Sequence, residues 1–462
     1  MKKNIPAIVP VITLLFYCCT YGTELNRSLE SAGSNRAELE AVLSHYRTAD
    51  PNPYKLRAAE YLIENLPAHY SYAGTKIYDY YGYAARILAD TALTPEQQRD
   101  SLLAITDSNY SDLPLHTIPD AEIITADYLI NNIERSYGRW TTCPWSGHIT
   151  FDEYLEWLLP YKAVELQELD SWRDTLLAHF GYGLNHPIKN DVEYNTTAGV
   201  ADMLRNEAQT KMQRYGLYTR AGLPLLSAHL LPRQTFGNIP DYALIAVLLM
   251  RSAGIPAVLD ETPVGSRYTA ATRWFVILSD RGMEETSEWD LSTMIGGGFF
   301  PYERGPKVYR NSYAINKERQ RYMERSRYRY PFELGKKDVT KQYFLTSDLQ
   351  LPIDRAARRQ LRDKYVYIAS AVRVDDNADQ TSAGSRPEPY GWQIVDLGVI
   401  KCGKACFRDM GREVLYMALG YDGDKLIPIS SSFILHKDGA IEYISSDTIN
   451  SPLLDRWKNN AL

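Results

Sequence analysis

Apolar residues recur at helical spacing along the first part of the chain. The spacing i, i+3, i+4, i+7 is met, for example, by Leu39, Val42, Leu43 and Tyr46. Prolines separate such segments, and Thr94 with Gln97 forms the capping-box pattern that starts a helix. The pattern predicts a helical region over residues 37–190.

A segment that is apolar on every face, 243–250, lies near the middle of the chain. Pro240 and Asp241 before it suit the first turn of a helix, where a missing N–H costs nothing and a negative charge is favoured. Gly254 and Pro256 after it are typical of a helix stop. The segment therefore predicts a buried helix.

Strand patterns follow this helix and continue to the end of the chain. Residues 257–262 and 273–279 have strand composition, and short alternating runs separated by turn residues fill 346–462. The latter predict an antiparallel β-sandwich. The very basic stretch 315–345 is expected to be a linker helix. The fold class is therefore α+β.

Composition excludes some classes of partner. The chain has 462 residues and a net charge of −6, with no basic block of the kind that binds nucleic acid. Its 35 Tyr against 11 Phe suit sugar-binding surfaces, or packing at hydrated domain interfaces. No pattern in the sequence implies a cofactor.

Two cysteines lie four residues apart around a Gly-containing turn, Cys402 and Cys406. They predict a hairpin disulfide, with free thiols as the alternative. A metal site is not expected, because zinc needs further ligands and His436 is the only histidine in 346–462.

The N-terminus has the pattern of an export signal over residues 1–19. A basic start precedes the apolar run 5–17, which is too short to cross a bilayer. The ending resembles the lipobox of bacterial lipoproteins, so Cys19 or Cys18 is the expected lipid-bearing residue; simple secretion is the alternative. This resemblance implies an outer-membrane lipoprotein of the cell envelope, held to the membrane by its anchor. Residues 20–36 are expected to be a polar tether.

The buried helix ends in Arg-Ser-Ala-Gly-Ile-Pro, residues 251–256, and leads into strands. This arrangement resembles the core of the transglutaminase-like superfamily, which has a papain-like fold, and implies such a core over 191–314. The family places a nucleophilic Cys at the start of this helix, a His on a following strand and an acid after it. Here the Cys position is Ile239 and the His position Thr272, while Asp290 remains as a possible acid.

Other segments resemble exported transglutaminase-like proteins of gut and oral Bacteroidales. Those proteins carry comparable motifs before and after the core, here Pro144-Trp145, Phe151–Tyr154, Gly403-Lys404, Met410–Arg412 and Pro428–Leu435. The resemblance covers most of residues 37–445.

The loss of both the Cys and the His implies a pseudoenzyme, a non-catalytic binding or scaffold protein of the cell envelope. Residues of the former catalytic region that suit a peptide or glycan ligand are Arg233, Tyr242, Arg273, Trp274 and Trp289. These side chains are also compatible with ordinary surface and core roles.

The alternative is a thiol-dependent peptidase or amide-transferring enzyme. Cys143 is the only cysteine between the signal and residue 402, and His148 follows five residues later. A relocated Cys/His pair requires folding to bring Cys143 into the cleft. Pro144 and Gly147 prevent one rigid helix from carrying both side chains.

Overall fold

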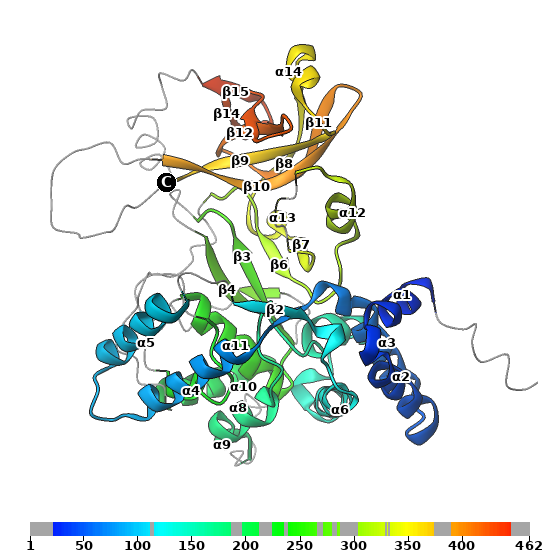
Figure 1. Cartoon of the computed structure of the whole chain (residues 1–462), viewed down its shortest axis with the longest axis vertical. Coiled ribbons are helices and arrows are strands. Elements are labelled where there is room, and N and C mark those ends of the chain that lie inside the picture. The colour runs from blue at the N-terminus through cyan, green and yellow to red at the C-terminus, as the bar shows by residue number, and fades with distance from the viewer. Residues whose placement is uncertain are drawn as a thin grey trace, which may run out of the picture.

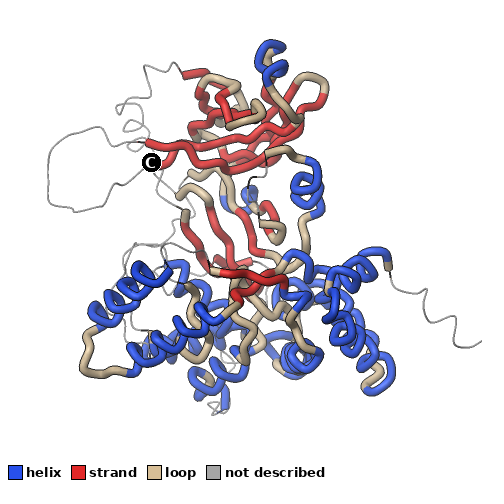
Figure 2. The backbone as a smooth tube through the Cα atoms, viewed as in Figure 1, coloured by secondary structure: helices blue, strands red, loops and turns tan. Residues whose placement is uncertain are grey.

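The computed structural model describes residues 22–110, 115–185, 196–211, 224–234, 239–265, 271–279, 284–286, 304–328, 330, 333–373 and 390–444. A helical lobe lies below a lobe made mainly of strands, with a smaller sheet between them (Figures 1 and 2). The predicted signal 1–19, with Cys18 and Cys19, lies outside the described residues, as do Trp289 and Asp290.

The helices are α1 Thr23–Ser31, α2 Arg36–Ser44, α3 Pro53–Asn65, α4 Thr75–Ala89, α5 Pro95–Tyr110, α6 Ala126–Thr142, α7 Phe151–Glu153, α8 Trp172–Phe180, α9 Tyr182–Asn185, α10 Thr197–Lys211, α11 Ile239–Ala253, α12 Lys317–Arg325, α13 Thr340–Tyr343 and α14 Arg355–Gln360. The strands are β1 Tyr70–Ala73, β2 His116–Pro119, β3 Ala257–Thr262, β4 Thr272–Leu278, β5 Glu284–Thr286, β6 Tyr309–Asn311, β7 Lys336–Asp338, β8 Thr346–Pro352, β9 Tyr365–Arg373, β10 Tyr390–Lys401, β11 Lys404–Gly411, β12 Leu415–Tyr421, β13 Leu426–Pro428, β14 Ser432–Leu435 and β15 Ile441–Ile444.

Strands β3 and β4 are buried on both faces. Their register pairs Val258 with Val276 and Leu259 with Phe275, so alternate pairs point to opposite sides. The face that packs on α1–α3 and α6 carries Val258, Trp274, Val276 and Leu278. The face that packs on α8, α10 and α11 carries Ala257, Leu259, Phe275 and Ile277. The core therefore has three layers, helices, sheet and helices.

The central helix α11 confirms the sequence prediction. It ends at Ala253, Gly254 follows with φ of 92°, and every side chain from Ala243 to Met250 is at most 4% exposed. Neighbouring segments cap its C-terminal end, because Trp145 Nε1 donates to the Ala253 carbonyl at 2.9 Å and Ser146 Oγ donates to that of Gly254.

The middle sheet has five antiparallel strands in the order β5-β4-β3-β6-β7. Its last strand, β7, comes from the region predicted as a linker helix over 315–345. Only α12, Lys317–Arg325, is a long helix there, and the short α13 follows β7. The prediction of a linker helix over 315–345 was wrong at residues 336–338, which form strand β7. The pairing of β7 with β6 joins segments far apart in the chain, and local sequence does not encode it.

The described part of the predicted tether, residues 22–36, is not a free tether. From Thr23 to Ser31 the chain is helical, and Leu25, Leu29 and Ala32 are buried in the same core as the other N-terminal helices. These three apolar residues fall at i, i+4 and i+7 on one face of an otherwise polar segment. The tether was predicted from the overall polarity of the segment, which does not reveal a single apolar face.

The C-terminal lobe is one antiparallel sheet in the order β15-β14-β12-β9-β10-β11-β8, with β13 paired to β12. The predicted strands are present, but they do not divide into the two sheets of a sandwich. Register shifts between Ile394 and Asp396 and between Phe407 and Met410 bend the long strands. The sheet thereby curls around its own apolar core.

The segment before β6 joins the middle sheet to the C-terminal sheet. Lys307 is fully buried; its ammonium group contacts Asp338 of β7 and lies 3.1 Å from Asp396 of β10. Tyr309 donates its hydroxyl to the Val395 carbonyl at 2.8 Å. Burial alone would lower the pKa of Lys307, but Asp396 and Asp338 outweigh burial and hold that pKa above its ordinary value.

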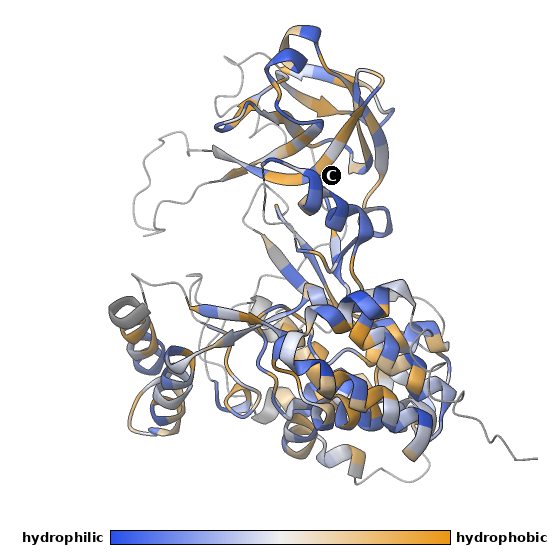
Figure 3. Ribbon diagram, turned by 45° about the vertical axis from the view of Figure 1, so that its right-hand side comes forward, coloured by the Kyte–Doolittle hydropathy of each residue, from blue (hydrophilic) through white to orange (hydrophobic). Residues whose placement is uncertain are grey.

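Hydrophobic and hydrophilic residues alternate along the helices of the lower lobe, as expected for helices that each bury one face (Figure 3). Within the described residues, no helix combines the length and the apolar character needed to cross a membrane.

Gly254→Ala is expected to lower the free energy of unfolding by about 1–3 kcal/mol, because a Cβ is strained at positive φ. The new Cβ would also lie 3.1 Å from Arg139 Cβ and from Ser146 Oγ. Gly82→Ala in α4 should instead raise the free energy of unfolding by about 0.5–1 kcal/mol, because alanine is the better helix former. Nothing lies within 4 Å of the position of an added Cβ at Gly82. Denaturant unfolding followed by tryptophan fluorescence measures both. Equal effects at the two sites would contradict the structure around Gly254.

Candidate functional site

The family's catalytic positions lie at the ends of two elements. Ile239 is the first residue of α11, and Thr272 is the first residue of β4, paired with Thr262. The side chains of Ile239, Tyr242 and Thr272 are not among those described.

Cys143 lies at the other end of α11. Its Sγ is 3.5 Å from where a Cβ on Gly254 would stand, and its side chain is 7% exposed. Because 15 residues of helix span about 22 Å, Cys143 is far from Ile239. Folding therefore does not bring Cys143 to the position of the family nucleophile, as the alternative required.

His148 is engaged elsewhere. Its Nε2 lies 3.1 Å from the Leu278 carbonyl, and because a carbonyl only accepts, this nitrogen carries the proton. Its Nδ1 is buried and has no hydrogen-bond partner in the described part of the chain. His148 thus helps to join the end of β4 to the loop after α6.

The expected cleft-binding residues are not brought together. Arg273 and Trp274 are neighbours on β4 and point to opposite faces. Arg273 Nε donates to Glu261 at 2.8 Å, whereas Trp274 is 3% exposed and donates to the Tyr343 hydroxyl at 3.1 Å. Arg233 is exposed in a separate 3₁₀ turn, Leu231–Arg233. The prediction of a ligand surface that includes Trp274 was wrong, because this ring is part of the core.

Cys402 and Cys406 are free thiols in the structure, so the predicted hairpin disulfide is absent. Cys402 and Gly403 form the tight turn between β10 and β11, with φ of 50° and 79°. Cys406 is two residues into β11, opposite Val399. A strand rises about 3.4 Å per residue, which carries Cys406 beyond the Cα separation of roughly 7 Å that a disulfide tolerates.

A cavity of about 300 Å³ lies between the middle sheet and the C-terminal sheet, and we call it the interdomain pocket. It is lined by Tyr309, Asn316, Glu318, Arg319, Asp338, Asp396, Leu397, Val399, Lys401, Cys406, Phe407, Arg408 and Asp409. Its volume is at the lower end of the range for small-molecule sites. Sequence reasoning missed it because its walls come from segments far apart in the chain.

The charges of the interdomain pocket divide into paired and unpaired groups. Lys307 neutralises Asp338 and Asp396 from behind the wall, and the Arg319 guanidinium lies over the Tyr309 ring at 4.4 Å. Lys401 and Arg408 are exposed, and neither these cations nor the lining carboxylates Glu318 and Asp409 have an ion-pair partner in the part of the chain that the structure describes. Two cations beside the apolar side chains of β10 suit a ligand with an anionic group and an apolar portion.

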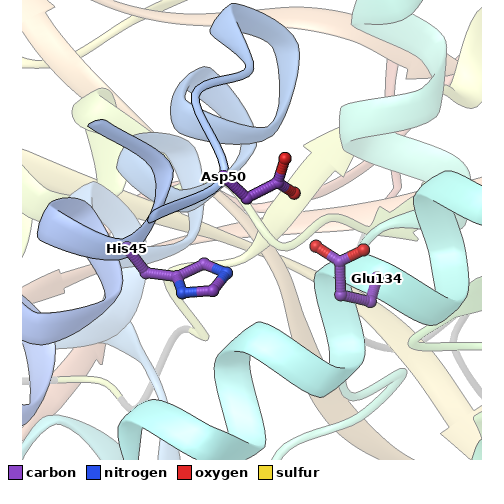
Figure 4. Close-up of side chains that lie close together, drawn as sticks. All are labelled: His45, Asp50 and Glu134. Atoms are coloured by element: carbon purple, nitrogen blue, oxygen red, sulfur yellow. The ribbon is translucent and has the colours of Figure 1, made fainter. Parts of the chain in front are cut away.

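A histidine and two carboxylates, His45, Asp50 and Glu134, lie close enough to hold a metal ion (Figure 4). However, the Lys55 ammonium lies 2.7 Å from both Asp50 and Glu134. Tyr46 also donates its hydroxyl to Glu134 at 2.9 Å. The lysine thus supplies the positive charge that a cation would bring.

Two carboxyl groups with altered acidity lie in the loop before α8. Burial, followed by the charge of Asp170, raises the pKa of Glu168 to about 7. Burial also raises the pKa of Asp170, although Oδ2 accepts a hydrogen bond from the Ala228 N–H at 2.6 Å. Tyr81, Tyr128 and His229 are titratable groups that interact with them. Such a pair can hold a proton near neutral pH.

Comparison of the chain with family models, curated proteins and solved structures finds no match. The transglutaminase-like resemblance therefore rests on the sequence motifs, and the function on the geometry of the described residues.

Cys143 is expected to react with iodoacetamide at least about tenfold more slowly than Cys402 in the native protein, because reaction requires local opening. Mass spectrometry of digested protein, sampled over time, distinguishes the sites, and the exposed Cys402 is the internal control. Unfolding should make the rates similar. Rapid labelling of native Cys143 below neutral pH would instead indicate a reactive thiolate.

Glu168→Gln should stabilise the protein more at pH 8 than at pH 5. The pKa of Glu168 is about 7 in the folded protein, against an ordinary value of 4.5, so the folded state binds the extra proton between these values. Wild-type stability therefore falls as pH rises through this window, and the variant lacks this loss. Melting temperatures at both pH values test this, with exposed Glu30→Gln on α1 as the matched control. An equal shift at pH 5 and 8 would contradict it.

Proposed function

We propose that the chain is an exported, lipid-anchored cell-envelope protein whose transglutaminase-like core has lost its Cys/His pair, and that the protein binds a peptide or glycan in the interdomain pocket without acting on it. The α11 helix packed against an antiparallel sheet is compatible with such a core. Ile239 at the start of α11 offers no nucleophile, and the buried Cys143 lies at the opposite end.

The observation that carries the binding role is the interdomain pocket. It combines two unpaired cations, Lys401 and Arg408, with apolar side chains of β10, such as Leu397 and Val399. A peptide bearing a free carboxylate fits this combination better than a neutral glycan, because charge-assisted hydrogen bonds are the stronger kind. Cell-wall peptides have this chemistry.

The binding role is tested by calorimetric titration of the mature protein with cell-wall stem peptides, their amidated forms and neutral glycan fragments. Replacing Lys401 and Arg408 together by Ser should weaken binding of the carboxylate peptide by about 100-fold, since the two charged contacts together contribute roughly 3 kcal/mol. The matched control is Arg358→Ser with Arg359→Ser, two exposed residues of α14 outside the pocket.

Two outcomes would overturn the proposal. Saturable binding to no member of the panel would exclude the peptide- or glycan-binding role and leave a structural one. Hydrolysis or amide transfer that disappears in Cys143→Ala would instead establish the thiol-dependent enzyme.

A further inference from the structure

Two buried arginines meet at the C-terminal end of α11, and neither contacts a carboxylate of the described residues. Arg251, in the last turn of α11, donates from Nε to the Ala257 carbonyl at 2.7 Å and from Nη1 to the Lys162 carbonyl at 3.0 Å. Arg173 of α8 donates to the Arg251 carbonyl, to Asn132 Oδ1 and to carbonyls of the segment 158–160. Their exposed fractions are 2% and 7%.

This arrangement differs from that of three other buried cations of the described chain, each of which contacts a carboxylate. Lys162 contacts Asp120, Lys307 contacts Asp338 and Asp396, and Arg310 contacts Asp260. Burial, followed by the charge of Arg173, lowers the pKa of Arg251 to about 9. A guanidinium stays charged in proteins, so its burial calls for a compensating negative charge.

A small cavity adjoins Arg251. Its volume is about 20 Å³, room for one water-sized occupant. The cavity is lined by His69, Lys162, Ala163, Val164, Glu165, Arg251, Asn311, Ser312, Tyr313, Glu333 and Gly335. It therefore lies where the N-terminal lobe, the end of α11 and the β6–β7 edge of the middle sheet meet.

Some hydrogen-bond donors around this cavity have no acceptor among the described residues. Asn311 Nδ2 is buried without a hydrogen-bond partner, and Arg251 Nη2 has none among the described residues. The carboxylate of Glu165 is already bonded to His69 Nδ1 at 2.7 Å and to the Tyr70 N–H at 3.0 Å. Lys336 lies 2.9 Å from Glu333. An occupant must therefore accept hydrogen bonds, and the one charge left uncompensated at the cavity is positive.

We propose that this cavity binds one small monovalent anion of the halide class, such as chloride, between the Arg251 guanidinium and the Asn311 amide. The ion supplies the negative charge that no described carboxylate provides. By contacting α11 and β6 at once it fastens the core to the edge of the middle sheet. This inference does not rest on the proposed function, because Lys401 and Arg408 take no part in it.

The first measurement is the melting temperature in sodium chloride and in sodium gluconate at equal ionic strength. The melting temperature should rise by about 1–3 °C per tenfold increase in chloride once the site begins to fill, and should not respond to gluconate. Identical melting temperatures in the two salts at every concentration would overturn the proposal.

Asn311→Asp gives the sharpest variant, because it puts a carboxylate oxygen where the unpartnered Nδ2 stands. The variant should lose its chloride dependence and be at least as stable in gluconate as the wild type is in chloride. Asn131→Asp, which makes the same charge change at an exposed position on α6, should keep the dependence. A variant at Asn311 that still responds to chloride would place the ion elsewhere.

Crystals grown in sodium bromide locate the ion directly. An anomalous peak between Arg251 and Asn311 is expected, and it should disappear in Asn311→Asp. An ordered water at that position, with no anomalous signal, would show a hydration site and overturn the anion proposal.

Discussion

The structure depends on burying both faces of the β3–β4 pair. Apolar side chains of β3 and β4 point to both faces, so removing either helical layer would expose a row of large side chains to water. At roughly 25 cal/mol per Å² of apolar surface, a single aromatic such as Phe275 contributes about 2–3 kcal/mol. The N-terminal helices therefore serve as the second half of the core and not as an appendage to it.

Buried ion pairs help to fix how the parts of the protein are arranged relative to one another. Lys307 joins the middle sheet to the C-terminal sheet through an aspartate from each, and Lys162, which is paired with Asp120, also donates to the Tyr70 carbonyl of β1. Buried ion pairs contribute little net stability, but losing one partner is costly, so they favour one arrangement of the lobes over others. Gly411 assists, because a Cβ there would overlap the carbonyl of Gly305, so the linking segment lies directly on β11.

The sequence could predict those features of the fold that depend on residues close together in the chain. The start and stop of α11 and the box between Thr94 and Gln97 involve residues a few positions apart, and both are present. The pairing of β7 with β6, the single curled sheet and the interdomain pocket all depend on contacts between distant segments. Trp274 shows the limit most clearly, because an aromatic on a strand looks the same in sequence whether it faces a ligand or Tyr343.

The docking of α1 has a consequence for how the protein would sit on a membrane. If the lipid is carried by Cys19, one of the two expected positions, only residues 20–22 separate the anchor from a helix fixed to the body. An extended chain reaches at most about 3.6 Å per residue, so the body would stand within roughly 15 Å of the lipid headgroups. Glu24 of α1 is in turn ion-paired to Lys317 of α12 at 2.8 Å, and α12 begins at the interdomain pocket. The interdomain pocket would thus open close to the bilayer surface. Small molecules could reach it there, whereas the membrane would sterically exclude large polymers.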